Sequence, residues 1–344
     1  MLYQRVYDKI LMSIQGIHME NAKTPISALC SVVCTTYNHA KYAAAAVQSI
    51  VAQDYRPIEI IIVDDGSTDD NVAVLRAALS ESGLSHKLIA QENTGNVAMN
   101  ANRALAAAKG QVCVLTSLDD LLLPGCISSK MAIMSENPAL VMVGNSTNAE
   151  IDSRGQITKA DCPNAVFGKE TADAEEMREI EFDRIGTFFL QGTAFRADFL
   201  AAIGAFEEGL TGDDLILRTK VWNHLIAHPE LRFVFLRRSG FAYRKHESNL
   251  HRSDFRQIRT VIDWQNRYFP DRPLHDSAVR WIRRFFNTCL ANGDNTALHA
   301  ALAYDPRMLE VFEVYHKTWK YRRRRIKHFV RRALGRAPVK TTAP

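Results

Sequence analysis

The stretch "IEIIIVDDGSTDD", residues 58–70, decides the fold of this chain. An apolar run of strand length ends directly against Asp64 and Asp65, and Gly66 then allows the chain to turn. Open α/β sheets bind ligands at the carboxyl ends of their strands. The doubled carboxylate therefore marks a candidate binding site, although a strand that simply emerges into a turn would also account for Gly66.

Strand and helix patterns alternate on both sides of this stretch. Alternation at this spacing predicts parallel strands joined by right-handed crossovers, as in nucleotide-binding α/β units. The predicted strands are 26–37, 58–65, 86–91 and 111–120, and the predicted helices are 39–53, 69–82 and 96–109.

The alternation loosens beyond residue 140. The patterns there predict a strand and hairpin around Ser153 to Gly155, a charged surface helix, a helix with acids at its start, a strand pair and an all-helical end. The last four of these span 173–182, 211–228, 231–249 and 253–312.

The composition is that of a globular protein that stays in solution, with 47% hydrophobic and 24% charged residues among 344. No apolar run has the length needed to cross a bilayer, and the first 25 residues lack the features of a secretory signal. Those residues predict either a short amphipathic helix or a loosely ordered leader. The six cysteines show no metal-ligand spacing, which favours buried free thiols and a cytoplasmic location.

The net charge of +5 hides an asymmetry along the chain. Residues 317–344 hold eleven of the 43 Lys and Arg residues and no acid, so the remainder carries a net charge of −6. Trp319, Ile326, Phe329, Val330 and Leu334 fall near one helical face among these cations. This pattern is typical of a helix on an anionic membrane surface. A solvated basic tail is the alternative, and no stacking platform favours nucleic acid.

Neither a G-x-G-x-x-G fingerprint nor a G-x-x-x-x-G-K-[ST] phosphate loop occurs in the chain. Two strand ends carry acid pairs instead, Asp64 with Asp65 and Asp119 with Asp120. Carboxylates can face a nucleotide diphosphate only if a divalent cation lies between them. The acid pairs therefore predict a metal-dependent nucleotide site.

Seven segments together resemble the family 2 glycosyltransferases, which have the GT-A fold and use nucleotide-diphosphate sugars. The segments are "SVVCTTYNHAKY", "QSIVAQDYRPIEIIIVDDGSTDD", "ENTGNVAMNANRALAAAKG", "TSLDDLLLPGCI", "GTAFRADFLAAIGAF", "TGDDLILRTKV" and "YRKHESN". The resemblance implies a Rossmann-like mixed sheet flanked by helices, with a C-terminal helical extension. The expected divisions are an N-terminal helical leader (1–25), a GT-A domain (26–250), a helical extension (251–312) and a basic amphipathic tail (313–344).

For the donor, the resemblance implies that Asp65, or secondly Asp64, accepts from the nucleobase or ribose, with Thr35 alongside. Thr35 as a plain strand residue and Asp64 as a turn cap are the structural alternatives. The same comparison places Tyr37, Asn38, Asn102 and Arg103 around the donor, although Arg103 would serve equally well as an exposed helix residue.

For the metal, the family's D-x-D-D site corresponds to "SLDD", with Ser117 in the first position instead of an acid. This departure leaves Asp119 as the implied ligand of Mn²⁺ or Mg²⁺, with Ser117 and Asp120 beside the donor. His246 matches a histidine that approaches the metal or diphosphate in many relatives. Two acids before "LLLP" would otherwise form only a turn.

The catalytic base is implied to come from the acid pair Asp213 and Asp214. Lys220 stands where many relatives have Arg, which gives Asp214 the catalytic position. An alignment on Arg218 would put Gly212 there, and glycine cannot serve as a base.

The implied function is inverting transfer of a sugar, from a UDP-sugar by preference, to a hydroxyl of a glycan or polyprenyl-linked acceptor. The setting would be O-antigen or capsule synthesis, at the inner face of the cytoplasmic membrane if the tail binds there. A nucleotidyltransferase and a non-catalytic sugar-nucleotide binding protein are the other two classes.

Overall fold

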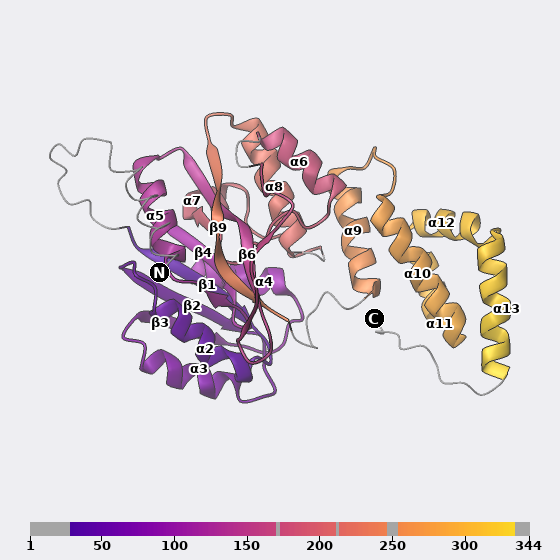
Figure 1. Cartoon of the computed structure of the whole chain (residues 1–344), viewed down its shortest axis with the longest axis horizontal. Coiled ribbons are helices and arrows are strands. Elements are labelled where there is room, and N and C mark those ends of the chain that lie inside the picture. The colour runs from indigo at the N-terminus through magenta and orange to yellow at the C-terminus, as the bar shows by residue number, and fades with distance from the viewer. Residues whose placement is uncertain (1–27, 170–172, 211–212, 246–253, 334–344) are drawn as a thin grey trace.

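The computed structural model describes residues 28–169, 173–210, 213–245 and 254–333. The predicted N-terminal leader and His246 therefore lie outside the described residues. A mixed sheet of nine strands occupies the centre of the first 245 residues, in the order β3-β2-β1-β4-β8-β6-β9-β5 with β7 paired to β6 (Figure 1). The strands are β1 (Cys30–Thr36), β2 (Ile58–Asp64), β3 (Ser85–Ala90), β4 (Val112–Ser117), β5 (Leu121–Leu122), β6 (Leu140–Ile151), β7 (Ile157–Pro163), β8 (Ala194–Arg196) and β9 (Arg232–Arg244).

The four parallel strands confirm the predicted alternation and bring their carboxyl ends to one edge of the sheet. Thr36 of β1 pairs with Asp64 of β2, and Thr35 pairs with Ser117 of β4. All seven residues of β2 are buried. A parallel strand covered on both faces is largely apolar, which is why "IEIIIVD" shows no polar alternation, and the buried Glu59 within it accepts from the Ser31 hydroxyl.

Helices cover both faces of the sheet and enclose two cores. One core packs β1 and β2 against α2, α3 and α5, and the other packs the opposite face against α4, α6, α7 and α8 (Figure 1). These helices are α2 (Ala40–Val51), α3 (Asn71–Ser80), α4 (Val97–Ala107), α5 (Cys126–Glu136), α6 (Ala174–Asp183), α7 (Ala197–Ala202) and α8 (Asp213–Ala227).

The strand pair predicted over 231–249 is wrong, because β9 runs unbroken through Ser239 and Gly240. It lies parallel to β6 along nearly its whole length, and its end pairs with β5. Gly240 serves close packing here, since a Cβ at that position would lie 2.3 Å from Asn145 Oδ1. The hairpin predicted around Ser153 to Gly155 is confirmed as the connection from β6 to β7.

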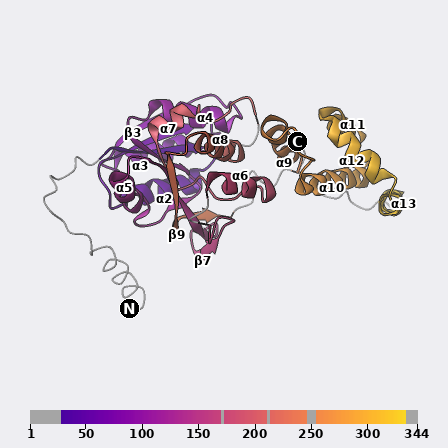
Figure 2. The ribbon, with the colours of Figure 1, turned by 90° about the horizontal axis from the view of Figure 1, so that it is seen from above.

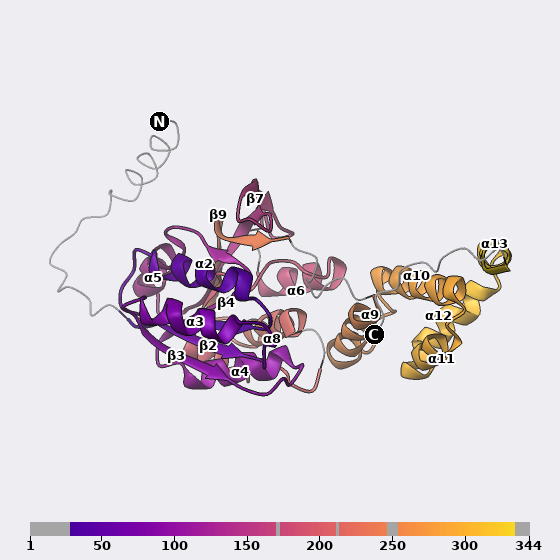
Figure 3. The ribbon, with the colours of Figure 1, turned by 90° about the horizontal axis from the view of Figure 1, so that it is seen from below.

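The helical end predicted for 253–312 is confirmed across the described residues. These helices lie to one side of the sheet, with α9 nearest to it (Figures 2 and 3). They are α9 (Asp254–Tyr268), α10 (Asp276–Asn292), α11 (Asn295–Tyr304), α12 (Pro306–His316) and α13 (Trp319–Ala333). They enclose a hydrophobic cluster of their own, and a second cluster joins α9 to α8.

Two further sequence expectations can be compared with this structure. All six cysteines are unbridged, five of them buried and Cys162 half-buried. Among the described residues, no helix combines the length and the apolar character that a bilayer crossing requires.

Candidate active site

Asp64 and Asp65 point in opposite directions because successive residues of an extended chain alternate sides. Asp64 is 1% exposed and faces the start of α3. It accepts hydrogen bonds from the Ser67 backbone N–H at 3.0 Å, the Ser67 hydroxyl at 2.6 Å and Asn71 Nδ2 at 2.6 Å. These contacts place Asp64 in the structural role of a turn cap, the alternative that the sequence left open.

Asp65 faces the loop between β3 and α4 and is 7% exposed. Its Oδ1 accepts from the Thr94 N–H and hydroxyl at 2.8 Å each and from Gln91 Nε2 at 3.0 Å, and its Oδ2 accepts from Gly95 N at 3.1 Å. Burial alone would raise the pKa of the Asp65 carboxyl, but the hydrogen bonds from Thr94 and Gln91 outweigh it and lower that pKa. A fixed negative charge is thus held at the sheet edge.

Gly66 is required at this turn for two physical reasons. Its φ of +72° lies in the left-handed region, and a Cβ there would approach Asn93 N to 2.5 Å. The glycine therefore lets the Asp65 turn and the loop after β3 pack against each other.

Thr35 and Ser117 lie side by side at the same edge and on the same face of the sheet as Asp65. They are register partners in β1 and β4. Val33 and Leu115, two positions before them and so on the same face, pack into the core that includes α4. Both side chains are half-buried. A planar group laid along these two strand ends would contact both side chains.

The loop after β1 places Tyr37 and Asn38 at the rim of this edge. Tyr37 is 44% exposed, so its ring is available to a ligand. Asn38 has a φ of +55°, its side-chain oxygen accepts from Thr68 N at 2.7 Å, and its backbone N–H donates to Ser67 Oγ at 2.8 Å. Asn38 therefore joins the loops after β1 and β2, a bridging role between two segments of the candidate site.

The acid pair after β4 is fixed to the end of β9. Arg244 donates from its backbone N–H to Asp120 Oδ1 at 2.8 Å and from Nε to the Asp119 carbonyl at 2.6 Å. Leu121 pairs with Ala242 in the adjoining strands, and the Ser117 hydroxyl donates to Asp119 Oδ1. Ser117 thus holds the carboxylate that follows it.

Carboxylates converge on Asp120 from two elements far apart in the sequence. Burial raises the pKa of the Asp120 carboxyl well above its usual range, the charge of Asp119 adds to the rise, the Arg244 N–H and guanidinium oppose it, and the charge of Asp214 adds to it again. Asp214 on α8 therefore lies within electrostatic reach of the strand-end acids. Asp213 begins α8, and its side chain is outside the described residues.

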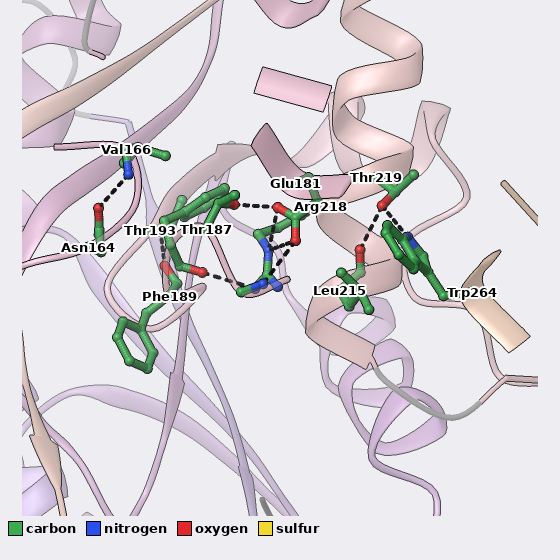
Figure 4. A network of polar contacts seen from close by, with 12 residues as sticks. Asn164, Val166, Glu181, Thr187, Phe189, Thr193, Leu215, Arg218, Thr219 and Trp264 are labelled. Carbon is green, nitrogen blue, oxygen red and sulfur yellow. Dashed lines mark hydrogen bonds and ion pairs between the residues drawn. The ribbon is translucent and has the colours of Figure 1, made fainter. Parts of the chain in front are cut away.

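The helix that carries Asp214 is held from two sides by buried polar contacts (Figure 4). Arg218, one turn after Asp214, pairs with Glu181 of α6 at 3.0 Å and donates to the Phe188 carbonyl at 2.9 Å. On the other side, Trp264 of α9 donates to the Thr219 hydroxyl at 2.7 Å.

The charged surface helix predicted over 173–182 is confirmed as α6, but two of its residues are buried. Met177 and Glu181 of α6 are fully buried, and Glu181 accepts from both Thr187 and Arg218. The acidic composition concealed this buried ion pair, because its partner lies 37 residues away in the sequence.

Asn102 and Arg103 lie on α4, the helix that follows the loop facing Asp65. Asn102 donates to the Phe206 carbonyl at 2.9 Å and to Glu208 at 2.8 Å, so it anchors the loop after α7. Arg103 is exposed and donates to Gln91, which in turn donates to Asp65. Asn102 thus holds the loop after α7, and Arg103 supports Gln91, which donates to Asp65.

Arg244 is the residue at this edge that sequence reasoning missed. It stands two positions before His246 in the quoted "YRKHESN", and its charge at the end of an apolar strand was the available signal. Arg244 is 2% exposed, and its guanidinium lies 4.6 Å above the Tyr42 ring. It links α2, the Asp119 loop and the end of β9.

The acids at this edge fit a hard divalent cation in donor chemistry. All their ligand atoms are oxygens. Burial raises the pKa of the Asp120 carboxyl, and the charges of Asp119 and Asp214, which a cation would offset, add to that rise. Among the described residues, no group of three or more His, Cys, Asp or Glu side chains is arranged to hold a metal ion. The phosphates of a bound donor would supply further oxygens.

Solved structures define the class of fold. Mannosyltransferase PcManGT from Pyrobaculum calidifontis, in complex with GDP-Man and Mn²⁺, matches with a TM-score of 0.51 and 16% identity over 96% of this chain and 95% of its own. Staphylococcus aureus TarS in complex with UDP-GlcNAc matches with a TM-score of 0.54 and 17% identity over 89% and 92% of the two chains. The fold is a GT-A glycosyltransferase fold with a helical C-terminal region, as predicted.

The sequence comparisons show which family this chain is similar to. Residues 31–196, a little under half of the chain, match the model of glycosyl transferase family 2. A curated relative is the Campylobacter jejuni GalNAc(5)-diNAcBac-PP-undecaprenol beta-1,3-glucosyltransferase, 30% identical over 38% of this chain and 40% of its own length. The first curated relatives are matched over only 29–40% of their lengths.

Proposed function

We propose that the protein is an inverting glycosyltransferase that moves a sugar from a nucleotide-diphosphate sugar to an acceptor hydroxyl. The observation that carries this proposal is that the charge of Asp214 acts on Asp120, which follows Asp119 after the strand edge where Thr35 and Ser117 pair. In this proposal the candidate base therefore serves the nucleotide site at that edge.

The donor nucleoside lies along the carboxyl ends of β1, β2 and β4 in this proposal. Asp65 accepts a hydrogen from the base or ribose on its Oδ2, which has one protein donor at 3.1 Å against three on Oδ1. Thr35 and Ser117 lie beneath the nucleoside, and Tyr37 lies at the rim. A UDP-sugar is the favoured donor, in keeping with the UDP-GlcNAc complex of TarS.

Asp119 and Asp120 are the residues that would hold Mn²⁺ or Mg²⁺, and His246 is a third candidate outside the described residues. When bound, the cation would neutralise charge on the diphosphate. The Mn²⁺ complex of PcManGT supports this assignment. Ser117 orients Asp119 through its hydroxyl, which compensates in part for the missing first acid.

Asp214 acts as the general base and Asp213 as its neighbour at the start of α8. Asp214 accepts the proton of the acceptor hydroxyl as the hydroxyl oxygen bonds to the anomeric carbon and the bond to the nucleoside diphosphate breaks. One displacement inverts the anomeric centre, so no residue needs to act as a nucleophile. The Glu181–Arg218 pair keeps this helix in position.

The proposed acceptor is a glycan or a polyprenyl-linked glycan of a cell-surface polysaccharide such as O-antigen or capsule. The undecaprenol-linked substrate named for the Campylobacter relative supports a lipid-linked acceptor. In the same proposal the protein is cytoplasmic and α13 lies on the inner membrane surface. Its Trp319, Ile326 and Phe329 are 66–70% exposed among arginines.

Calorimetric titration of UDP, GDP and dTDP, with and without Mn²⁺, tests the donor site. We expect one nucleotide to bind in a Mn²⁺-dependent way, and Asp119→Ala to lose the dependence. Binding of no nucleotide to the folded wild type would overturn the proposal.

Membrane attachment is tested separately by co-sedimentation with vesicles that contain phosphatidylglycerol. Ile326→Gln/Phe329→Gln should reduce binding, because the substitutions remove exposed apolar surface and leave the charge unchanged. Equal sedimentation of the wild type and this variant would exclude the role of the apolar face.

A further inference from the structure

We call the strand ends that carry Thr35, Asp65, Ser117 and Asp119 the donor edge. A second charged site lies apart from it, in the C-terminal helices. A cavity of about 520 Å³ opens between α10 and α13, two helices that pack against each other. We call it the basic cleft. Its eleven lining residues, all within the described part of the chain, include five Lys or Arg residues and one His, and none of them is acidic.

The two helices direct matching cationic faces toward this cavity. Arg280 and Arg284 are one turn apart on α10, and Lys320, Arg324 and His328 follow one another at the same spacing on α13. The cations therefore line both walls along the length of the cleft. Like charges that face each other repel, and a multivalent anion between them removes that repulsion.

Neutral groups hold two of these guanidinium groups in place. Arg324 Nη1 donates to the Tyr315 hydroxyl at 3.3 Å, and that hydroxyl donates to Asn287 at 2.9 Å. Arg280 donates to the Ser277 hydroxyl at 2.7 Å. A neutral partner orients a guanidinium without cancelling its charge, so the cleft is prepared to receive an external anion.

The volume of the cleft and its guanidinium groups indicate which anions it can bind. Its volume is that of a small-molecule site, and guanidinium groups match phosphate oxygens in a bidentate manner. We propose that the basic cleft binds a phosphate or diphosphate group, presented either by a soluble phosphate compound or by a lipid headgroup. This site is separate from the donor edge and does not depend on the proposed glycosyl transfer.

The basic cleft and the exposed apolar residues occupy different faces of α13. Successive helical residues are about 100° apart, so Lys320, Arg324 and His328 form one row while Trp319, Ile326 and Val330 form another. Variants of one row therefore leave the other intact. This separation allows headgroup capture in the cleft to be distinguished from insertion of the apolar face.

The test compares two variants of the full chain that lose the same charge. Arg284→Gln/Arg324→Gln removes one cation from each wall of the cleft, and Arg322→Gln/Arg325→Gln removes two exposed arginines outside it. Calorimetric titration with inorganic pyrophosphate in EDTA gives one arm, since EDTA prevents metal-dependent binding at the donor edge. Co-sedimentation with phosphatidylcholine vesicles with and without phosphatidate gives the other.

We expect the cleft variant to lose about tenfold or more in affinity, because two charge-assisted hydrogen bonds are removed, and the control about twofold or less. Loss of pyrophosphate binding alone identifies a soluble phosphate compound, and loss of phosphatidate binding alone identifies a lipid headgroup. Wild type that binds neither probe, or equal losses in the two variants, would overturn the inference. The unfolding midpoints of both double variants should equal that of the wild type, which shows that they fold. If the cleft variant does not fold, the single variant Arg284→Gln replaces it in the same test.

Discussion

The donor edge and the basic cleft carry opposite charges and are built in different ways. At the donor edge, strand register fixes the acids, and backbone N–H groups and short side chains hold them. In the cleft, long side chains extend from two helix surfaces and are oriented by neutral hydroxyls. Chemistry that requires fixed geometry suits the first arrangement, whereas capture of an anion tolerates the second.

The largest expected effect comes from replacing the proposed catalytic base. Asp214→Asn should lower the turnover number about 10²- to 10⁴-fold, the range typical for loss of a general base, and leave donor affinity unchanged. The turnover number is measured as the rate at which nucleoside diphosphate is released from the sugar donor identified by titration.

Arg284→Gln/Arg324→Gln should keep wild-type turnover of a soluble acceptor in the same assay, because the cleft lies outside the donor edge. Asp213→Asn serves as the neighbouring control. If Asp214→Asn retains full turnover, Asp214 is not the base.

The next effect concerns the frame that positions Asp214. Arg218→Met leaves Glu181 buried without its cation, which should cost about 3–5 kcal/mol in the free energy of unfolding. Replacing both residues, as in Glu181→Leu/Arg218→Met, should restore most of that loss. Urea denaturation measures all three proteins.

The matched control is an exposed ion pair between α6 and the segment that precedes it. Lys169 pairs with Glu176 of α6, and both side chains are 44–48% exposed. Lys169→Met should cost about 1 kcal/mol or less, because water screens the exposed charges. Comparable losses for Lys169→Met and Arg218→Met would show that burial does not decide the strength of these pairs.

The sequence predicts the arrangement of this strand edge because its determinants are local. Strand periodicity places Thr35, Asp65 and Ser117 at the ends of β1, β2 and β4, and parallel pairing then brings these strand ends to one edge. The sequence could not decide between Asp64 and Asp65, because both follow the same strand. Their partners, Ser67 and Thr94, lie in different loops, and only the fold assigns each carboxylate to its own loop.

The sequence does not predict the contacts between elements that are distant in the chain. Arg244 meets Asp120 across 124 positions, and Arg284 lines the same cleft as Arg324 without any shared motif. Such pairs depend on helix packing and on the antiparallel pairing of β5 with β9. Residue type alone carries little information about them.

A smaller effect separates two requirements at the turn after Asp65. In Gly66→Ala the new Cβ would sit on a residue with a positive φ and would also clash with the Asn93 backbone. In Gly83→Ala only the positive φ is unfavourable, because no atom lies within 4 Å of the new Cβ. The conformational cost should be about 1 kcal/mol or somewhat more for Gly83→Ala. Gly66→Ala should lose more stability and also weaken nucleotide binding. Equal unfolding free energies for the two variants would show that the Asn93 contact adjusts without cost.

The smallest effect depends on pH and sharpens the contrast between the two charged regions. The folded-state pKa of Asp65 lies below its usual 3.8, so the charged carboxylate stabilises the folded protein above that pH. This stabilisation is lost as the pH falls through the folded-state pKa. Asp65→Asn should therefore be less stable by about 1–3 kcal/mol at pH 7, with the difference shrinking below pH 4 as wild-type Asp65 becomes protonated. Arg284→Gln/Arg324→Gln should show no such change, because guanidinium groups do not titrate in this range. Urea denaturation between pH 3 and pH 7 measures both, and a deficit for Asp65→Asn that stays constant with pH would mean that packing, not charge, accounts for the role of Asp65.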